Sequence, residues 1–296
     1  MAEEEHPRDK LLHVTDLHFW KLVTNPFELL NKRFLGNFNV WLRRRHRFAI
    51  HRAEEFAGAL AETGVNQVLL TGDFTSTAHH DEFAMAKAFL ERLEERGMQA
   101  LILPGNHDVY TFEASRKQRF EQYLGTFAPD GRLPVRTDLP GGTPLILVPT
   151  AVPNPLSARG RVTDETVSAV KRIIDDCPGG PVVVAAHYPL LDRTNAYSSH
   201  PGRRLGNAHA LRACLGDIGR PILCAAGHVH RFSHVRDPAY PELHHLTTAA
   251  FVRQDPDAGI HGEFTEIHVM RGHFRIFRHQ RTRDRWTRQA SENTRT

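Results

Sequence analysis

Five short apolar segments of the chain each run directly into a cluster of carboxylate, amide or imidazole side chains. Open α/β sheets gather their sites at the carboxyl ends of their strands, so polar clusters far apart along the chain can meet at one rim. The pattern therefore requires a fold that brings the five segment ends together. Read as buried strands, the segments are Leu11–Thr15, Gln67–Thr71, Gln99–Leu103, Pro181–Ala186 and Pro221–Ala226.

Helical spacing of apolar residues separates several of these strands. Helices are predicted over Phe48–Thr63, Asp81–Arg96 and Thr163–Asp176. Gly64 and Gly97 directly follow the first two and suit their C-terminal ends. Strands that alternate with helices in this way are typical of α/β architecture.

The C-terminal part of the chain has a different, β-rich pattern. Segments 243–250, 262–270 and 273–279 predict antiparallel strands, the last two joined by a tight turn. An α/β series followed by a β-rich end indicates a mixed α/β (α+β) fold. Because no internal repeat or linker divides the sequence, we expect a single domain over residues 1–296.

The composition excludes several classes of protein. In a chain of 296 residues, no apolar run reaches the roughly 18 residues that a membrane-spanning helix needs. The polar start MAEEEHPRDK lacks the apolar core of a signal peptide. A net charge of +4 is low for a nucleic-acid-binding protein, and no feature indicates a protein partner. Three widely spaced cysteines favour reduced thiols, so we expect a cytoplasmic protein.

The polar clusters at the strand ends have the composition of a metal site. They supply carboxylate, imidazole and amide donors but no thiolate, which suits manganese, iron or zinc. About seven such donors are too many for one tetrahedral zinc ion, whereas two metal ions that share a carboxylate can use them all. Residues two apart in extended backbone face the same side. We therefore expect Asp16 and His18 to point together, and likewise His228 and His230.

The motifs DLH, GD, GNHD, a lone histidine before a proline-containing turn, and GHVH occur in this order from Asp16 to His230. Together they resemble the calcineurin-like metallophosphoesterase superfamily. The resemblance implies a four-layer fold, with two packed mixed β-sheets flanked by helices, and two divalent metal ions, with Mn favoured and Fe or Zn as alternatives. Asp73 would bridge the two ions. The implied ligands are Asp16, His18, Asp73 and His230 for one ion, and Asp73, Asn106, His187 and His228 for the other.

The same resemblance implies a catalytic role for His107, which is not a ligand in the family pattern. It would sit over the metal ions and protonate the departing oxygen, which is general acid work. Asp108 is grouped with it as a catalytic residue, and would either orient His107 or cap the following segment. On its own, the GNHD motif is more typical of a turn with a surface histidine.

A basic insert between the first two motifs bears on the substrate. Within an expected helical insert at about 26–48, Phe38, Trp41 and the arginines Arg43, Arg44 and Arg45 are candidates for substrate binding. Such a basic amphipathic helix would suit an anionic membrane surface or a lipid pocket. The alternative is an ordinary helix that packs its aromatic residues on the domain.

The insert, together with GDFTSTAHHDEF and LPGNHDVYT, resembles the chlamydial-type UDP-2,3-diacylglucosamine pyrophosphohydrolases of lipid A synthesis. The resemblance implies hydrolysis of this nucleotide lipid to 2,3-diacylglucosamine 1-phosphate and UMP. It also implies peripheral contact with the inner face of the membrane. The partner would then be a phosphorylated small molecule or a nucleotide-lipid substrate.

Other functions stay open at this point. A phosphodiesterase that acts on cyclic nucleotides or another small phosphodiester would carry the same five motifs. The Ser/Thr protein phosphatase branch is disfavoured, because its Asp-Arg-Gly element is replaced here by FTSTAHHDEF after the GD motif. A non-catalytic scaffold is disfavoured too, since every ligand position and His107 are filled.

Overall fold

The structure is a computed structural model that describes residues 6–21, 52–154, 157–255, 259–283, 285–291 and 294–295. The predicted insert at about 26–48 lies outside these residues. So do the five candidate substrate-binding residues within it, Phe38, Trp41, Arg43, Arg44 and Arg45.

The first of two large sheets has six strands in the order β14-β13-β12-β1-β2-β3. The strands β1, β2 and β3 run parallel, whereas β12, β13 and β14 add antiparallel neighbours beside β1. The bounds are β1 Asp9–Val14, β2 Gln67–Leu70, β3 Gln99–Ile102, β12 Ile260–Val269, β13 Phe274–Thr282 and β14 Arg285–Ser291.

The second sheet has seven strands in the order β15-β10-β11-β9-β7-β5-β4. It is also mixed, because β5, β7, β9 and β11 are parallel, β4 is antiparallel to β5, and β10 is antiparallel to β11 but parallel to β15. The bounds are β4 Val135–Asp138, β5 Pro144–Leu147, β7 Val182–Ala185, β9 Ile222–Ala226, β10 Ser233–Arg236, β11 Leu243–Thr247 and β15 Thr294–Arg295. A small separate sheet pairs β6 (Gly160–Arg161) with β8 (Leu205–Gly206).

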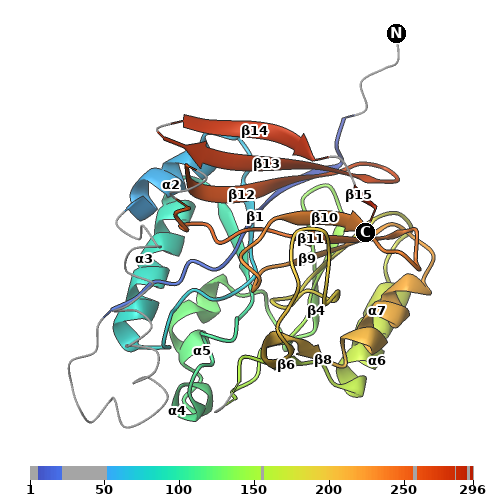
Figure 1. Ribbon diagram of the computed structural model, residues 1–296, viewed down its shortest axis with the longest axis horizontal. Helices are drawn as coiled ribbons and strands as arrows, with labels where there is room; N and C mark the ends of the chain where they lie inside the picture. The colour runs from blue at the N-terminus through green and yellow to red at the C-terminus, as the bar shows by residue number, and fades with distance from the viewer. Residues whose placement is uncertain are drawn as a thin grey trace.

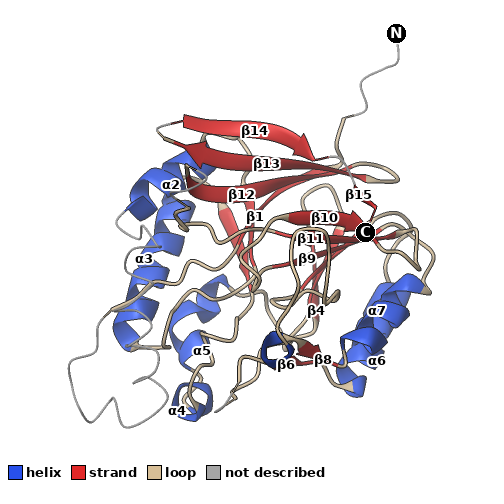
Figure 2. Ribbon diagram, viewed as in Figure 1, coloured by secondary structure: helices blue, strands red, loops and turns tan. Residues whose placement is uncertain are grey.

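Helices cover the outer face of each sheet, and the two sheets pack against each other between them (Figures 1 and 2). On the first sheet lie α2 (Ala53–Ala61), α3 (His80–Glu95), α4 (Phe112–Arg116) and α5 (Arg119–Leu124), followed by the 3-10 turn η4 (Gly125–Phe127). On the second lie α6 (Asp164–Asp175) and α7 (Ala208–Gly216), and the 3-10 turn η5 (Pro201–Arg203) precedes β8. The predicted four-layer α/β architecture is confirmed.

Alternation along the strands explains why the layers stack in this way. In β1, Leu12 and Val14 belong to the core under α2 and α3, whereas Leu11 faces the second sheet. In β2, Leu69 likewise lies between the sheets, while Val68 faces the helices. Strands buried on both faces read as continuous apolar runs. Such runs are what made the strands recognisable in the sequence.

The predicted strands and helices agree with the observed ones to within a few residues, apart from the predicted start of the first helix at Phe48, which lies outside the described residues. Other elements were not predicted from the sequence. The edge strands β4 and β14 and the helix α7 were not predicted, because their residues are polar or lack a clear period. The three cysteines are free thiols. None of the helices in the described ranges combines the length and hydropathy needed to cross a membrane. The single domain over residues 1–296 stays a prediction.

Candidate metal centre

The candidate centre forms where strands of both sheets end side by side. The neighbouring strands β1, β2 and β3 end just before Asp16, Asp73 and Asn106, and β7 and β9 of the other sheet end before His187 and His228. Backbone hydrogen bonds continue beyond the strands and hold these ends together. The amide of Asp16 donates to Gly72 O at 3.1 Å, and Gly227 N donates to His187 O at 3.0 Å.

The ligand-bearing turns have left-handed backbone. The φ angles are +55° for Asp16, +50° for His18, +55° for Asp73, +67° for His228 and +54° for His230. Such conformations cost about 1–3 kcal/mol for a non-glycine residue and persist where the surroundings enforce them. The expectation that each i, i+2 pair lies on extended backbone was therefore wrong, since both strands have ended and the chain curls.

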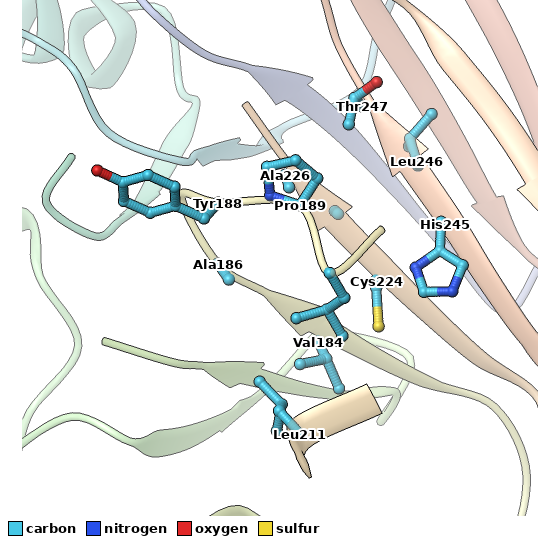
Figure 3. Close-up of a pocket in the computed structure, with 12 residues that line it drawn as sticks. Val184, Ala186, Tyr188, Pro189, Leu211, Cys224, Ala226, His245, Leu246 and Thr247 are labelled. Carbon is cyan, nitrogen blue, oxygen red and sulfur yellow. The ribbon is translucent and has the colours of Figure 1, made fainter. Parts of the chain in front are cut away.

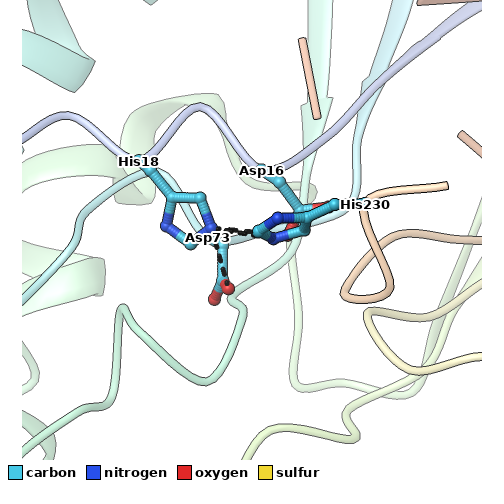
Figure 4. Close-up of side chains that lie close together, drawn as sticks. All are labelled: Asp16, His18, Asp73 and His230. Carbon is cyan, nitrogen blue, oxygen red and sulfur yellow. Dashed lines mark hydrogen bonds and ion pairs between the residues drawn. The ribbon is translucent and has the colours of Figure 1, made fainter. Parts of the chain in front are cut away.

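The first group of predicted ligands contains Asp16, His18, Asp73 and His230, whose donor atoms lie within 4.8 Å of one another (Figure 4). His18 Nε2 lies 3.0 Å from His230 Nε2 and 3.7 Å from Asp73 Oδ2. His230 Nε2 lies 3.4 Å from Asp16 Oδ1. A carbonyl oxygen, that of Thr75, faces His18 Nδ1 at 3.4 Å, so Nδ1 carries the proton and Nε2 presents its lone pair to the group.

The second group contains Asp73, His187 and His228, and Asn106 joins it. His187 Nδ1 donates to the carbonyl oxygen of Thr71 at 2.7 Å, which leaves an acceptor lone pair on Nε2. That Nε2 faces Asn106 Oδ1 at 3.1 Å and Asp73 Oδ1 at 3.5 Å. Three acceptor atoms that face one another in this way suit a cation between them.

His228 differs from His230 in its partners, although the two are only two residues apart. His228 Nε2 donates to the carbonyl oxygen of Arg203 at 2.9 Å, so Nδ1 is its ligand atom. Its backbone N–H donates to Asp16 Oδ2 at 2.9 Å. His230 therefore belongs to the first group and His228 to the second. The family resemblance predicted this division, whereas extended backbone would have placed the two side chains on the same side.

Charge and burial show that the centre fits two divalent cations. Asp16 and Asp73 are both almost completely buried, and Asp16 Oδ1 receives no hydrogen bond from the described residues. Burial alone would raise the pKa of the Asp16 carboxyl, but His230 and the neighbouring histidines hold that pKa at about 2. Burial lowers the pKa of His187, and it lowers that of His228 to about 3, so both rings are neutral. The carboxylates therefore need compensating positive charge, which divalent ions supply.

His107 lies beside the first group and is not one of the residues whose donor atoms form it. Its Nδ1 donates to Ser76 O at 2.7 Å, which makes Nε2 the ring nitrogen that can exchange a proton with a substrate. The ring stacks on Tyr110, with centroids 5.2 Å apart and planes at 9°, and meets the edge of His18 at 4.9 Å. Its backbone N–H donates to Asp73 Oδ1 at 2.8 Å. The general acid role stays a prediction, and this geometry is consistent with it.

Asp108 holds the loop that carries Asp73, the carboxylate shared by the two groups. Its side chain is buried and accepts hydrogen bonds from Gly105 N at 2.9 Å, Thr75 N at 2.9 Å, Phe74 N at 3.3 Å and Thr75 Oγ1 at 3.0 Å. Burial raises its pKa to about 6 even against these bonds. These contacts fix the backbone on both sides of the centre. We therefore interpret Asp108 as a positioning residue instead of the catalytic residue predicted from the sequence.

Two glycines permit the close approach of the loops after β2 and β3. A Cβ atom on Gly105 would lie 2.2 Å from Asp73 Oδ1, and one on Gly72 would lie 2.3 Å from Gly105 N. Neither backbone can yield without moving Asp73. The glycines of the GD and GNHD motifs are thus as necessary to the centre as the side chains beside them.

Sequence reasoning missed the groups that orient the imidazoles. The backbone carbonyls of Thr71, Thr75, Ser76 and Arg203 fix which ring nitrogen of each histidine carries its proton. Thr75 and Ser76 belong to the stretch FTST that follows the GD motif, and its small polar residues could have indicated a tightly hydrogen-bonded loop beside the centre. The Arg203 carbonyl carries no side-chain signal at all.

The centre opens into a cavity of about 940 Å³, at the upper end of the size of small-molecule sites. Its lining includes Asp73, Asn106, His107, Tyr110, His228 and His230, and also Ser157, Tyr197 to His200 and Arg203. A second cavity of about 10 Å³ lies between β7, β9 and α7, lined by residues such as Val184, Leu211 and Cys224 (Figure 3). It is too small for a substrate, and burial raises the pKa of the Cys224 thiol, so no reactive thiolate forms there.

Comparison with known proteins agrees with this geometry. The family model for calcineurin-like phosphoesterases matches residues 9–232, which include every predicted ligand. A dimetal phosphatase from Danio rerio has a similar fold, with a TM-score of 0.66 at 13% identity over 97% of this chain and 100% of that one. Purple acid phosphatase PPD1 from yellow lupin (Lupinus luteus) is similar with a TM-score of 0.57 at 12% identity, over 94% of this chain and 52% of that one. No curated protein sequence matches the chain.

Replacing the shared carboxylate should empty the whole centre. In Asp73→Ala we expect both metal ions and all phosphoester hydrolysis to be lost, because Asp73 belongs to both groups of ligands. Metal content by inductively coupled plasma mass spectrometry checks this, with the exposed Asp130→Ala as the matched control. Near-normal metal content in Asp73→Ala would show that the assignment of the bridge is wrong.

Replacing His107 should separate catalysis from metal binding. In His107→Asn we expect unchanged metal content and a turnover lowered by about 10²–10⁴-fold, the scale of a lost proton transfer. The matched control is His209→Ala, an exposed histidine on α7. Loss of one metal ion from the His107 variant would instead make this residue a ligand.

Proposed function

We propose that this chain, which belongs to the calcineurin-like phosphoesterase family and is a dimetal phosphoester hydrolase, acts on UDP-2,3-diacylglucosamine. The products are 2,3-diacylglucosamine 1-phosphate and UMP. The observation that carries the proposal is the cavity of about 940 Å³ over the metal centre. Its volume is larger than a phosphate monoester requires, and it suits a substrate that extends on both sides of the reacting phosphorus.

The two groups of ligands around Asp73 would hold the ions, which supply Lewis-acid charge for the attack of water on phosphorus and for the phosphoryl oxygens. The chain itself handles the leaving group. Water releases one proton to solvent as its oxygen bonds to one phosphorus, and the bridging P–O bond breaks. The bridging oxygen leaves with the second phosphate, and His107 Nε2 delivers the proton that this oxygen takes up. The Ser76 carbonyl and the stacked Tyr110 ring keep the His107 imidazole in position for that transfer.

Two features support a lipid-linked substrate. The resemblance of the basic insert to the lipid A pyrophosphohydrolases is the first, and it supports a peripheral contact with the inner face of the membrane. The second is Phe112, whose side chain is 61% exposed and which follows the cavity residue Tyr110 by two positions. An exposed aromatic residue beside a site suits contact with an acyl chain.

One observation favours a second candidate, the hydrolysis of a cyclic nucleotide or another small phosphodiester. The described lining of the cavity includes the polar side chains of Ser157, Ser198 and Ser199. Such a lining suits a hydrophilic substrate without acyl chains. The acyl chains of the first candidate would therefore have to lie outside this part of the cavity.

A product assay separates the two candidates. The manganese-loaded protein is incubated with UDP-2,3-diacylglucosamine or with cyclic AMP, and the products are identified by mass spectrometry. We expect UMP together with the lipid phosphate, no AMP, and formation of both products lowered by about 10²–10⁴-fold in His107→Asn. Formation of AMP with an intact nucleotide lipid would contradict the proposal and support the cyclic nucleotide.

A further inference from the structure

Part of the cavity wall comes from residues 192–204, a segment between β7 and β8 whose conformation is held by hydrogen bonds within the segment. The amide of Ser199 donates to Asp192 O at 2.7 Å, and Thr194 N donates to Tyr197 O at 2.9 Å. Arg204 Nε donates to Ser199 O at 3.2 Å, and its guanidinium pairs with the carboxylate of Asp192 at 3.2 Å. The wall is therefore preformed, as a surface that recognises a substrate needs to be.

Two arginines carry positive charge from this wall to the metal centre. Arg203 lines the cavity, and its carbonyl oxygen accepts the hydrogen bond from the predicted ligand His228. Arg231 lines the same cavity and directly follows the predicted ligand His230 in the chain. The backbone of each arginine is therefore adjacent to a predicted ligand of the centre. An anion held by them would lie next to a phosphoryl group at the metal ions.

The charge of these two arginines is not neutralised within the described part of the chain. Nearby Arg204, Arg212 and Arg253 each pair with a carboxylate, whereas Arg203 and Arg231 form no ion pair with the carboxylates of the described residues. Asp73 is the carboxylate in the cavity lining, and it belongs to the metal centre. Positive charge gathered in a cavity attracts an anionic ligand and is complemented by it.

We propose that Arg203 and Arg231 form an anion subsite that binds the second phosphate of a diphosphate diester while the first phosphate reacts. The inference rests on the proposed function and deepens it, because it makes the diphosphate link itself the feature that is recognised. When the bridging P–O bond breaks, the departing phosphate gains negative charge beside the two guanidinium groups. A cyclic nucleotide has a single phosphate and leaves the subsite empty.

The test compares UDP and UMP as competitive inhibitors of bis(p-nitrophenyl) phosphate hydrolysis by the manganese-loaded protein. The two nucleotides differ by one phosphate, so the ratio of their inhibition constants reports the subsite and cancels any general loss of activity. We expect UDP to bind about tenfold more tightly than UMP, the scale of one charge-assisted hydrogen bond. Arg203→Ala and Arg231→Ala should each reduce this ratio, and the double variant should bring it to about one.

The matched control is Arg193→Ala, an exposed arginine of the same loop that does not line the cavity. It should keep the ratio of the unmodified protein. Equal inhibition by UDP and UMP in the unmodified protein would overturn the subsite, as would an unchanged ratio in the double variant. An equal loss in Arg193→Ala would overturn it too, because the effect would then be one of general charge.

The failure of the subsite and the failure of the proposed substrate give different results. If UDP-2,3-diacylglucosamine is not hydrolysed but the preference for UDP exists and depends on both arginines, the lipid substrate is wrong and the diphosphate subsite stands. If the lipid is hydrolysed and the preference is absent, the proposed function stands and the subsite is wrong.

Discussion

The mutual repulsion of buried acceptor atoms is the constraint on which the rest of this structure depends. Asp16 and Asp73 are almost completely buried, and His187 turns a lone pair toward the oxygens of Asp73 and Asn106. Burying an uncompensated carboxylate costs several kcal/mol, so the interior of a folded protein does not hold several such groups together unless cations compensate their charge. The arrangement makes sense as a site for two divalent ions, and the surrounding elements hold the ligands in place for them.

The strained backbone of the ligand-bearing turns lies at the strand ends, where the two sheets restrain it. Five predicted ligands have left-handed backbone, which no local preference of the chain would choose. The turns that carry them follow strands whose side chains pack on both faces, and hydrogen bonds such as His18 N to Asp73 O at 2.9 Å join one turn to the next. The carboxylate of Asp108 also holds the loops after β2 and β3, because it accepts hydrogen bonds from their backbone amides. The packing of the two sheets thus stabilises left-handed turns that would be unfavourable in an isolated peptide.

Much of this could be predicted from the sequence, because strands buried on both faces are continuous apolar runs and each run ends at a ligand-type residue. The paths of the turns could not be predicted, since the left-handed φ of His228 and His230 depends on contacts with Asp16, more than 200 residues away. The role of Asp108 was likewise hidden, because a carboxylate next to a catalytic histidine has the same sequence pattern whether it orients the ring or caps a loop. Backbone acceptors such as the Arg203 carbonyl have no sequence signature.

We infer that one carboxylate, that of Asp73, joins two metal ions at the strand ends. A crystal structure of the manganese-loaded protein, with anomalous difference maps collected at the manganese edge, would locate both ions. We expect two anomalous peaks about 3.5–4 Å apart, one on each side of Asp73, with His18 and His230 at the first and His187 and His228 at the second. A single peak, or two peaks that do not share Asp73, would contradict it.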